Sequence, residues 1–396
     1  MASAQTPVPP LHMRRDRFDP PAEMAGFRER PGLAQVTTPL GRPAWLVTRY
    51  EDAREVLGDA TRFSSAGLPV VPVPGATPEE QRSGNLLMLD PPEHTRLRRL
   101  LTGEFTVKRI RRLQPRIAEI VDAHLDAMAQ AGPPADLVPD FALPVPSLVI
   151  CELLGVPYSD RAEFHGRAAK QLDLTRPMEE RGKVAMESRA YMGDLVDRAL
   201  AEPGHDMLGM LVREHGDDLT RTELVGVASL LLIAGHETTA NMLAIGTLAL
   251  LRNPEQAAMV RDDPAVTAPA VEELMRYLSV VHSGVPRVAT TTTEVAGQAV
   301  APGDVLVVSL PAADRDRALV EDPDRLDVGR AASHHVAFGH GVHHCLGAPL
   351  ARMEMATAFP ALLRRFPTLA PAIPFDDVDF RSASLVHGLR SLPITW

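Results

Sequence analysis

Cysteine is scarce in this sequence: only Cys151 and Cys345 occur among 396 residues. Two cysteines cannot form a disulfide framework, so we expect the chain to fold in a reducing compartment and predict a cytoplasmic location. Aromatic residues are also few, at 4% of the chain, whereas hydrophobic residues make up 45%. Aliphatic side chains must therefore fill most of the core, and the length suits one large domain or two ordinary ones.

An excess of positive charge is missing as well. The formal net charge is −10, which argues against nucleic acid as a general partner. The first residues, MASAQTPVPPLHMRRDRF, lack the apolar centre of a signal peptide, so we predict neither a signal peptide nor a membrane anchor.

Only one apolar run, residues 224–251, is long enough to span a bilayer. Its centre reads Gly-His-Glu-Thr-Thr, and the carboxylate of Glu237 would be costly to expose to lipid. We therefore predict that this run is a long helix through the core of a soluble protein and that the chain does not enter a membrane.

The chain shows no internal repeat, no low-complexity tract and no interdomain linker. Residues 43–50 have the pattern of a strand, residues 50–59 that of a short helix, and residues 293–310 that of a hairpin with glycine and proline turns. Helical periodicity dominates the middle of the chain. We predict a mainly α fold with a small β portion, forming a single domain over residues 1–396. Its expected parts are a loop and β-rich N-terminal part (1–60), a helical core (93–280), a hairpin, meander and cysteine loop (293–345), and a last helix with a C-terminal turn (346–396).

The densest cluster of reactive side chains is HHVAFGHGVHHCLGAPLAR, residues 334–352. A structural zinc site needs about four nitrogen or sulfur ligands at suitable spacing. Here there is one cysteine, and four of the five histidines form two adjacent pairs that cannot easily converge on one ion. The glycines instead allow the backbone to pass close to a flat object. Cys345 precedes a predicted helix start, where backbone N–H groups and the helix dipole favour a thiolate.

Within this cluster, FGHGVHHCLG resembles the haem-binding loop of the cytochrome P450 family, F-G-x-G-x-[HR]-x-C-x-G, at every fixed position. The resemblance implies that Cys345 is the thiolate ligand of the iron in haem b, iron protoporphyrin IX. It also implies that Phe338, Gly339 and Gly347 shape the cofactor-binding loop and that His343 binds a propionate. We interpret the other four histidines as polar loop residues and Cys151 as core packing.

Three further segments support the resemblance. In DPPEHTRLRRLL, His94 and Arg98 lie on one helix face, and the family uses such a pair, together with Arg287 in GVPRVA, to bind propionates. AGHETT matches the family's [AG]-G-x-[DE]-T-T, which implies that Ala234 and Gly235 lie against the cofactor. Thr238 and Glu237 would then deliver protons during oxygen activation. The alternative is a threonine that only satisfies the carbonyl of Ala234 in a bent helix.

EELMRYL matches the family's E-x-x-R. The resemblance implies a buried, structural network of Glu273 and Arg276 with a later arginine, best matched by Arg325 in DPDRLDVGR. The sequence departs from the family where ADRD replaces the usual ANRD and puts Asp314 in the asparagine position.

The resemblance implies a soluble haem-thiolate monooxygenase that inserts one oxygen atom of O2, usually as a hydroxyl group, into an apolar macrolide, terpenoid, steroid or xenobiotic-like molecule. Electrons would come from an external ferredoxin and ferredoxin reductase, because no part of the chain resembles a flavin or iron–sulfur domain. Eight basic residues within 96–116 face a single acid, Glu104, and form a candidate docking patch for an acidic ferredoxin; a solvated helix face is the alternative. The expected substrate-lining residues are Leu86, Leu87, Ile233, Ala234, Val281, Val285, Leu385 and Val386.

Two other classes of function remain open at this point. Haem could serve only for binding, for sensing, or for rearranging or coupling a substrate without inserting oxygen. The chain could also be a zinc protein with His and Cys ligands. The intact pair of Glu237 and Thr238 favours oxygen activation over the first of these, and metal analysis would decide the second.

Overall fold

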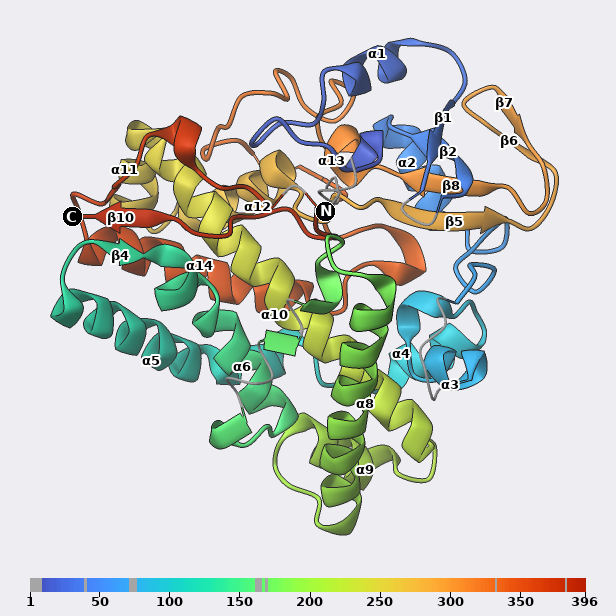
Figure 1. The fold of residues 1–396 in the computed structure, drawn as a ribbon, viewed down its shortest axis with the longest axis horizontal. Helices are drawn as coiled ribbons and strands as arrows, with labels where there is room; N and C mark the ends of the chain where they lie inside the picture. The colour runs from blue at the N-terminus through green and yellow to red at the C-terminus, as the bar shows by residue number, and fades with distance from the viewer. Residues whose placement is uncertain are drawn as a thin grey trace, which may run out of the picture.

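The computed structural model describes residues 9–38, 41–70, 77–160, 166–167, 170–331, 333–381 and 383–396. Helices dominate it, as predicted (Figure 1). Their bounds are α1 (Glu23–Glu29), α2 (Tyr50–Gly58), α3 (Pro78–Arg82), α4 (Glu93–Thr102), α5 (Val107–Ala131), α6 (Pro144–Leu154), α8 (Met178–Ala201), α9 (Met207–His215), α10 (Arg221–Leu251), α11 (Pro254–Asp262), α12 (Thr267–Leu278), α13 (Leu310–Ala313) and α14 (Ala348–Arg365).

The strands form one five-stranded sheet and two smaller sheets. The largest sheet has the order β1-β2-β8-β5-β3, in which β2 runs parallel to β8 and the other pairs are antiparallel. Its strands are β1 (Ala34–Thr37), β2 (Pro43–Val47), β8 (Val305–Val308), β5 (Val285–Ala289) and β3 (Phe63–Ser64). The remaining strands are β4 (Ala135–Asp136), β9 (Ala370–Pro371) and β10 (Pro393–Thr395) in one sheet, and β6 (Thr293–Val295) and β7 (Gln298–Val300) in the other.

Most local predictions agree with these elements. The strand predicted at residues 43–50 is β2, the following helix is α2, and the predicted hairpin contains the pair β6 and β7. The rest of that predicted hairpin, β8, instead joins β2 and β5, because its apolar run is buried in the large sheet. Strand β1 lies in the N-terminal part predicted to be loop and β-rich, and it pairs with β2 in antiparallel register.

Helix α10 runs through the middle of the molecule, between α6, α8 and α14 (Figure 1). It begins with a capping box: the hydroxyl of Thr220 accepts from the backbone N–H of Glu223 at 3.2 Å, and the Glu223 carboxylate accepts from the N–H of Thr220 at 2.8 Å. Most of its apolar residues are buried by protein. No helix among the described residues is long and apolar enough to cross a bilayer.

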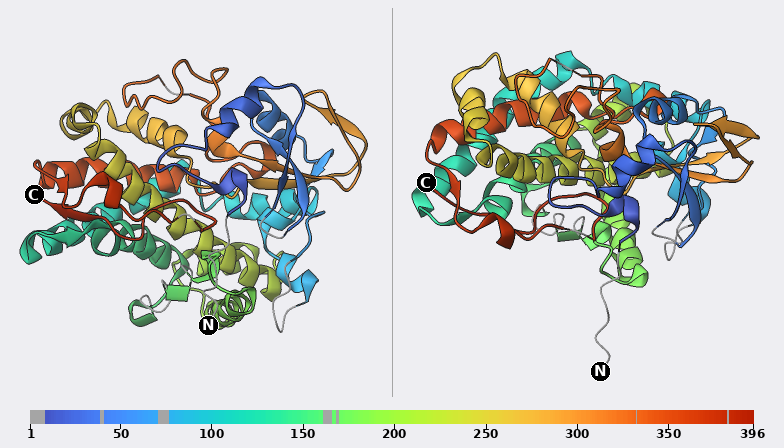
Figure 2. Two further views of the ribbon diagram at one scale, coloured as in Figure 1. Left: turned by 45° about the horizontal axis from the view of Figure 1, so that its top comes forward. Right: turned by 90° about the horizontal axis from the view of Figure 1, so that it is seen from above.

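Among the described residues, the apolar interior divides into a large cluster among the helices, a smaller one under the sheet and a third, small one of Met24, Leu46 and Ala312. Figures 1 and 2 show the strands of the main sheet gathered at one end of the molecule, beside α2, with α5, α11 and α14 at the other. The loop before Cys345 joins the first two clusters, since Val336 belongs to the sheet cluster and Phe338 to the helical cluster. The predicted site residues therefore lie where the two cores meet.

Candidate functional site

The middle of α10 is open on one face. Most of the helix is buried, yet Ala234 is exposed and Ile233, Gly235 and Thr238 are partly exposed. Small and apolar side chains left open inside an otherwise buried helix indicate a hollow beside them. The Thr238 hydroxyl donates to the carbonyl of Ala234 at 2.9 Å, the bond that the spacing predicts. Thr238 therefore satisfies its neighbour's backbone and also faces the hollow.

The predicted proton donor Glu237 is turned toward a different partner. Its side chain is 1% exposed, with one carboxylate oxygen 3.2 Å from an Arg381 guanidinium nitrogen and 3.4 Å from the amide nitrogen of Asn241. The other oxygen lies 3.6 Å from Nε2 of His236. Arg381 comes from the C-terminal segment, 144 residues away in sequence. Glu237 thus forms a buried ion pair with Arg381 rather than pointing freely at the hollow.

The cysteine loop closes on itself just before α14. The N–H of Gly339 donates to the carbonyl of Val336 at 2.7 Å, and the N–H of Cys345 donates to that of Phe338 at 2.8 Å. Gly339 has a φ of +74°, and a side chain there would have only the His343 carbonyl within 4 Å, at 3.6 Å. This open space beside the backbone fits the predicted close passage of a flat ligand.

Two glycines expected to approach a cofactor have another explanation as well. A Cβ on Gly341 would lie 2.5 Å from the carbonyl oxygen of Leu57 at the end of α2. A Cβ on Gly235 would lie 2.8 Å from the side chain of Ile150 in α6. Close packing against α6 and the end of α2 therefore favours glycine at both positions, and the predicted approach of Gly235 to a cofactor stays a prediction.

The Cys345 side chain is exposed, although protein surrounds it. Burial raises the pKa of its thiol. Burial outweighs the backbone N–H groups of Gly347 and Ala348 and the charges of Arg98 and Arg352, all of which lower that pKa. Together these observations describe a sulfur enclosed by the protein but not covered by it. Such a thiol is held as a thiolate when a metal cation lies against it.

Four basic side chains that the family resemblance assigns to propionates lie together. The rings of His94 and His343 are 4.3 Å apart, and the charges of Arg98 and Arg287 lower the pKa of both histidines, after the larger effect of burial. The pKa of His343 falls to about 3 and that of Arg287, through burial, to about 10. We call His94, Arg98, Arg287 and His343 the basic cradle.

The basic cradle has no matching carboxylate within the described ranges. Arg287 is 4% exposed and donates to the carbonyl of Pro286, and both ring nitrogens of His94 are buried without a hydrogen-bond partner there. The nearest acid, Asp90, already accepts from the hydroxyl of Ser64 at 2.5 Å and from the N–H of Ser65 at 2.8 Å. Buried cations and donors without an anion are costly, so the cradle fits a ligand that carries negative charge.

The histidines around Cys345 point to separate partners. His343 Nε2 lies 3.2 Å from the Ser65 hydroxyl, His335 Nε2 lies 3.2 Å from a Glu272 oxygen, and the His334 carbonyl accepts from the Tyr50 hydroxyl at 2.7 Å. Among the described residues no three His, Cys, Asp or Glu side chains are placed to hold one ion. The side chains therefore diverge, and the site suits a cofactor held by Cys345 alone.

The predicted substrate-lining residues come from four segments. Leu87 is 56% exposed and Ala234 is exposed, whereas Ile233, Val281, Val285 and Leu385 are partly exposed. Leu86 and Val386 are buried, at 5% and 6% exposed, so they pack against protein more than they face a hollow. Two backbone hydrogen bonds hold the C-terminal turn in place. The N–H of His387 donates to the carbonyl of Val280 at 2.8 Å, and the N–H of Leu385 donates to that of Leu172 at 3.2 Å.

The predicted scaffold contains one wrong residue. Glu273 and Arg276 form a bidentate ion pair at 2.7 and 2.8 Å, and their side chains are 2% and 0% exposed. The later arginine is Arg330, whose guanidinium lies 3.3 Å from Glu273, and not Arg325. The Arg325 side chain is 64% exposed and pairs with Asp322 and Asp327; its backbone carbonyl alone takes part, accepting from Arg276 at 3.3 Å. Two nearby carboxylates on an exposed turn hold Arg325 outside the core.

Asp314, which replaces the family's usual asparagine, is fully buried. Its carboxylate accepts from the hydroxyl of Ser279 at 2.5 Å and from the N–H of Val336 at 2.7 Å. Burial raises the pKa of this carboxyl even though His335, Ser279, Val336 and Arg276 act to lower it. The acid thus ties the end of α12 to the start of the cysteine loop.

Part of the predicted basic patch is already neutralised. Arg96 pairs with Glu223 and also donates to the Asp218 carbonyl, Arg109 pairs with Glu104 and Glu214, and Arg116 pairs with Glu119 and Glu152. The exposed cations of the segment for which the described residues provide no ion pair are Arg99, Lys108, Arg111 and Arg112. We call these four, with the 57% exposed side chain of Val107 among them, the basic face.

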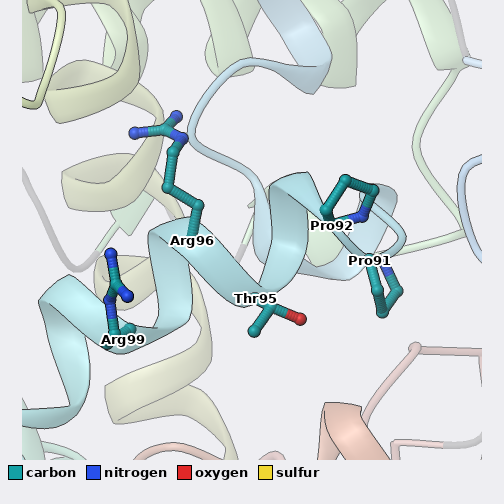
Figure 3. A pocket seen from close by; sticks show the side chains of 5 residues that line it. All are labelled: Pro91, Pro92, Thr95, Arg96 and Arg99. Carbon is teal, nitrogen blue, oxygen red and sulfur yellow. The ribbon is translucent and has the colours of Figure 1, made fainter.

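An open groove of about 550 Å³ lies along α4 and is lined by Pro91, Pro92, Thr95, Arg96 and Arg99 (Figure 3). It shares no residue with the basic cradle or with the predicted substrate lining. Arg99 links the groove to the basic face. The groove is therefore a feature of the surface that carries the predicted docking patch.

Comparison with known proteins identifies the family. The family model described as Cytochrome P450 matches residues 11–173 and 204–387. Cytochrome P450 FAS1 of Rhodococcoides fascians is 51% identical over 393 residues, covering 98% of each chain, and pentalenic acid synthase of Streptomyces avermitilis is 43% identical, also covering 98% of each. The crystal structure of CYP105P1 in complex with filipin I superposes with a TM-score of 0.91 at 39% identity, covering 98% of this chain and 99% of the other.

The mainly helical fold, the exposed Cys345 thiol and the basic cradle fit a protein that holds an anionic cofactor. The chain belongs to the cytochrome P450 family. It is a monooxygenase, an oxidoreductase whose family membership implies a haem cofactor, O2 and a small-molecule substrate.

Proposed function

We propose that Cys345 is the iron ligand and that the cofactor is haem b, iron protoporphyrin IX. The observation that carries this proposal is the enclosed but uncovered Cys345 sulfur beside a basic cradle that lacks its anion. Two propionates would supply that anion, with His94, Arg98, Arg287 and His343 as their partners. The chain has no C-x-x-C-H sequence, which argues for a haem held without thioether bonds.

The test compares the two cysteines. Reduced wild-type protein exposed to CO is expected to show the red-shifted Soret band of a thiolate-ligated haem. Cys345→Ala is expected to abolish that band, while Cys151→Ala, which changes a buried thiol of α6 that is 0% exposed, keeps it. A band that persists in Cys345→Ala would overturn the assignment.

When bound, the haem supplies O2 activation and the transfer of one oxygen atom to carbon. We infer that the chain's part is proton delivery from α10. The Thr238 hydroxyl donates to Ala234, so its lone pairs remain free to accept from a water in the hollow, which then carries the proton. Glu237 relays the next proton: its carboxylate takes a proton from solvent water and passes it to the water at Thr238 when the side chain leaves Arg381.

Thr238→Ala distinguishes this role from a purely structural one. Loss of a positioned proton donor costs about 10²–10⁴-fold in the assisted step. The variant is therefore expected to bind substrate and consume reductant almost normally, yet to release more hydrogen peroxide and form less product. Product formed per reductant consumed is measured for wild type and variant with one accepted substrate. If product formed per reductant consumed did not change, the role of Thr238 would be limited to its hydrogen bond with the Ala234 carbonyl.

We propose an apolar small molecule of macrolide, terpenoid, steroid or xenobiotic type as substrate, and hydroxylation as the usual reaction. The open aliphatic side chains at Leu87, Ile233 and Ala234 support an apolar ligand. The names of pentalenic acid synthase and of the filipin I complex are consistent with this range. A screen of such compounds for a substrate-induced Soret shift tests the proposal; binding confined to charged, hydrophilic compounds would overturn it.

We propose further that the electrons come from a ferredoxin and its reductase, with the basic face as the docking surface for an acidic ferredoxin. Exposed cations around the apolar Val107 support this surface, and α4, which carries Arg99, also carries the Arg98 charge that acts on Cys345. This partnership, together with a cysteine count too low for a disulfide framework, favours a cytoplasmic location.

The ferredoxin test uses neighbouring arginines that differ in pairing. Arg112→Glu is expected to slow reduction by an acidic ferredoxin several-fold without changing the CO spectrum, whereas Arg109→Gln, which removes a cation already paired with Glu104 and Glu214, has a smaller effect. Salt is expected to reduce the difference, because exposed charges are screened beyond about 10 Å at 0.1 M. Equal rates for wild type and Arg112→Glu would reject this docking face.

A further inference from the structure

A second charged cluster lies beside the cysteine loop and outside the family motifs used above. Glu272 of α12 and Arg352 of α14 form a bidentate ion pair at 2.6 and 2.8 Å. His335 Nε2 lies 3.2 Å from one oxygen of the same carboxylate. Burial acts to raise the pKa of Glu272, but the hydrogen bonds from Arg352 and His335 outweigh it and bring that pKa to about 2. Glu272 is therefore an anion at any working pH.

His335 belongs to this cluster and not to the solvent. Its side chain is 2% exposed, although its position in a histidine-rich loop suggested an ordinary polar loop residue. The N–H of Ala337 donates to Nδ1 of the ring at 3.2 Å. Because Nδ1 accepts, the proton lies on Nε2, which donates to Glu272. The loop thus binds Glu272 through one defined tautomer.

Arg352 connects the cluster to the cysteine. Its guanidinium carbon lies 4.5 Å from the centre of the Phe338 ring, and the Phe338 carbonyl accepts from the backbone N–H of Cys345 at 2.8 Å. Arg352 is thus near enough for its charge to act on the sulfur. The Glu272 carboxylate, which accepts two hydrogen bonds from the same guanidinium, carries the opposite charge. The positive potential at Cys345 depends on both.

We propose that Glu272, held by His335, is a positioning residue that fixes Arg352 beneath the cysteine loop and offsets its charge, and that this pair sets the reduction potential of the haem. The proposal rests on Cys345 being the iron ligand. Reduction adds an electron at the haem, so positive charge nearby favours the reduced form and negative charge disfavours it. Removing either partner must therefore move the potential, and the two removals must move it in opposite directions.

The test is a spectroscopic redox titration of substrate-free holoprotein at low ionic strength, because the Arg352 side chain is 38% exposed and salt screens its charge. Glu272→Gln is expected to raise the potential and Arg352→Met to lower it. Each shift corresponds to a roughly tenfold change in the ratio of reduced to oxidised haem at fixed potential, which is about 59 mV for a one-electron couple. The double variant is expected to return close to wild type.

Matched variants separate charge from structure. Glu272→Asp and Arg352→Lys keep the charges and are expected to lie near the wild-type potential. Arg365→Met removes an exposed cation of the same helix α14, paired with Asp126 at 2.6 Å, and is expected to leave the potential unchanged. If Arg352→Met does not fold, the contrast between Glu272→Gln and Glu272→Asp carries the same test.

The outcomes distinguish this proposal from the assignment of Cys345 as the iron ligand, on which it rests. Shifts of the same sign in the two single variants, a double variant whose shifts do not cancel, or an unshifted Glu272→Gln would overturn the role of the pair while the red-shifted CO band of wild type remains. Absence of that band in wild type would overturn the assignment of Cys345 and this proposal with it.

Discussion

Two sets of basic side chains in this protein differ in one respect. Near the C-terminal end of α12, Arg276 donates to both carboxylate oxygens of Glu273 and to the backbone carbonyls of Asp314 and Pro323. In the basic cradle, Arg98 and Arg287 have no carboxylate among the described residues, and both nitrogens of His94 are unpartnered. A buried cation whose anion comes from the same chain forms a structural ion pair that needs no ligand. A buried cation without such an anion marks a place where a ligand brings the anion.

The same distinction orders the energies. Once formed, a buried ion pair adds little net stability, but removing one partner leaves an uncompensated charge and costs about 3–5 kcal/mol. In the basic cradle the free-energy cost of an uncompensated charge is present until the cofactor binds. Relief of that cost therefore adds to the free energy of cofactor binding. Substitutions of Glu273 or Arg276 should therefore lower the free energy of unfolding, and substitutions in the basic cradle should lower the affinity for the cofactor.

Glu273→Gln is the strongest test of this contrast. The variant leaves Arg276 buried without its counter-charge, so the free energy of unfolding is expected to fall by about 3–5 kcal/mol. Urea titration of the holoprotein, followed by far-UV circular dichroism, measures the change. Arg325→Gln is the control: its side chain is 64% exposed and outside the network, so the change is expected to stay within about 0.5 kcal/mol. Equal losses in the two variants would remove the distinction between Arg325 and Arg330.

The sequence predicted those parts of the site that depend on local spacing. The cysteine loop, the stripe of His94 and Arg98, and the bond from Thr238 to Ala234 each need only a few consecutive residues and the geometry of a turn or helix. Glu273 and Arg276, three residues apart on a helix, are equally local. The mainly helical fold followed from periodicity and from the same motifs.

The parts that it missed depend on contacts between distant segments. Glu237 pairs with Arg381 across 144 residues, and Glu272 pairs with Arg352 across 80. Arg325 and Arg330 are five residues apart in an irregular segment, and only the folded path of the chain decides which of them reaches Glu273. One signal was available for Glu272: the sequence places two acids side by side before the arginine, and one helix cannot turn both toward the same partner.

Removing a cation from the basic cradle should weaken cofactor binding and spare the fold. A hydrogen bond to a charged group is worth about 1.5–3 kcal/mol, so Arg287→Gln is expected to weaken haem binding roughly 10- to 150-fold. The measurement is the equilibrium transfer of haem to a scavenging protein. Arg62→Gln is the control, since Arg62 lies near the same sheet and pairs with Glu55 and Asp59. Wild-type haem affinity in Arg287→Gln would show that the cradle does not bind the cofactor.

A third group of buried bases sharpens the comparison, because its members are neutral. His12, His282 and His387 are 2%, 0% and 1% exposed. Burial lowers the pKa of each, to about 4 for His12 and about 3 for His282, and the charge of Arg15 adds to the effect on His282 and His387. His282 Nε2 lies 2.7 Å from the Ser384 carbonyl, and His387 Nε2 lies 2.7 Å from that of Arg17. The rings of His282 and His387 therefore act as neutral donors that join distant segments.

Neutral buried histidines make the fold sensitive to acid. Above about pH 6.5 the ring is neutral in both folded and unfolded chains and contributes no pH dependence. As the pH falls below that value the unfolded chain takes up a proton and the folded chain does not, so stability is lost until the folded pKa is reached, near 3 for His282. Linkage gives a loss of about 2 kcal/mol for one such residue at about pH 5.

His282→Gln isolates this contribution, because the glutamine amide keeps a donor for the Ser384 carbonyl and never titrates. The variant loses ring packing and is expected to be somewhat less stable than wild type at about pH 7. Between about pH 7 and pH 5, however, its free energy of unfolding should fall by about 2 kcal/mol less than that of wild type. Urea titrations at the two pH values measure the difference, and His205→Gln, at an exposed histidine, should reproduce the wild-type change. If His282→Gln and wild type lost the same stability on acidification, His282 would carry a proton in the folded chain and would belong with the charged groups of the first comparison.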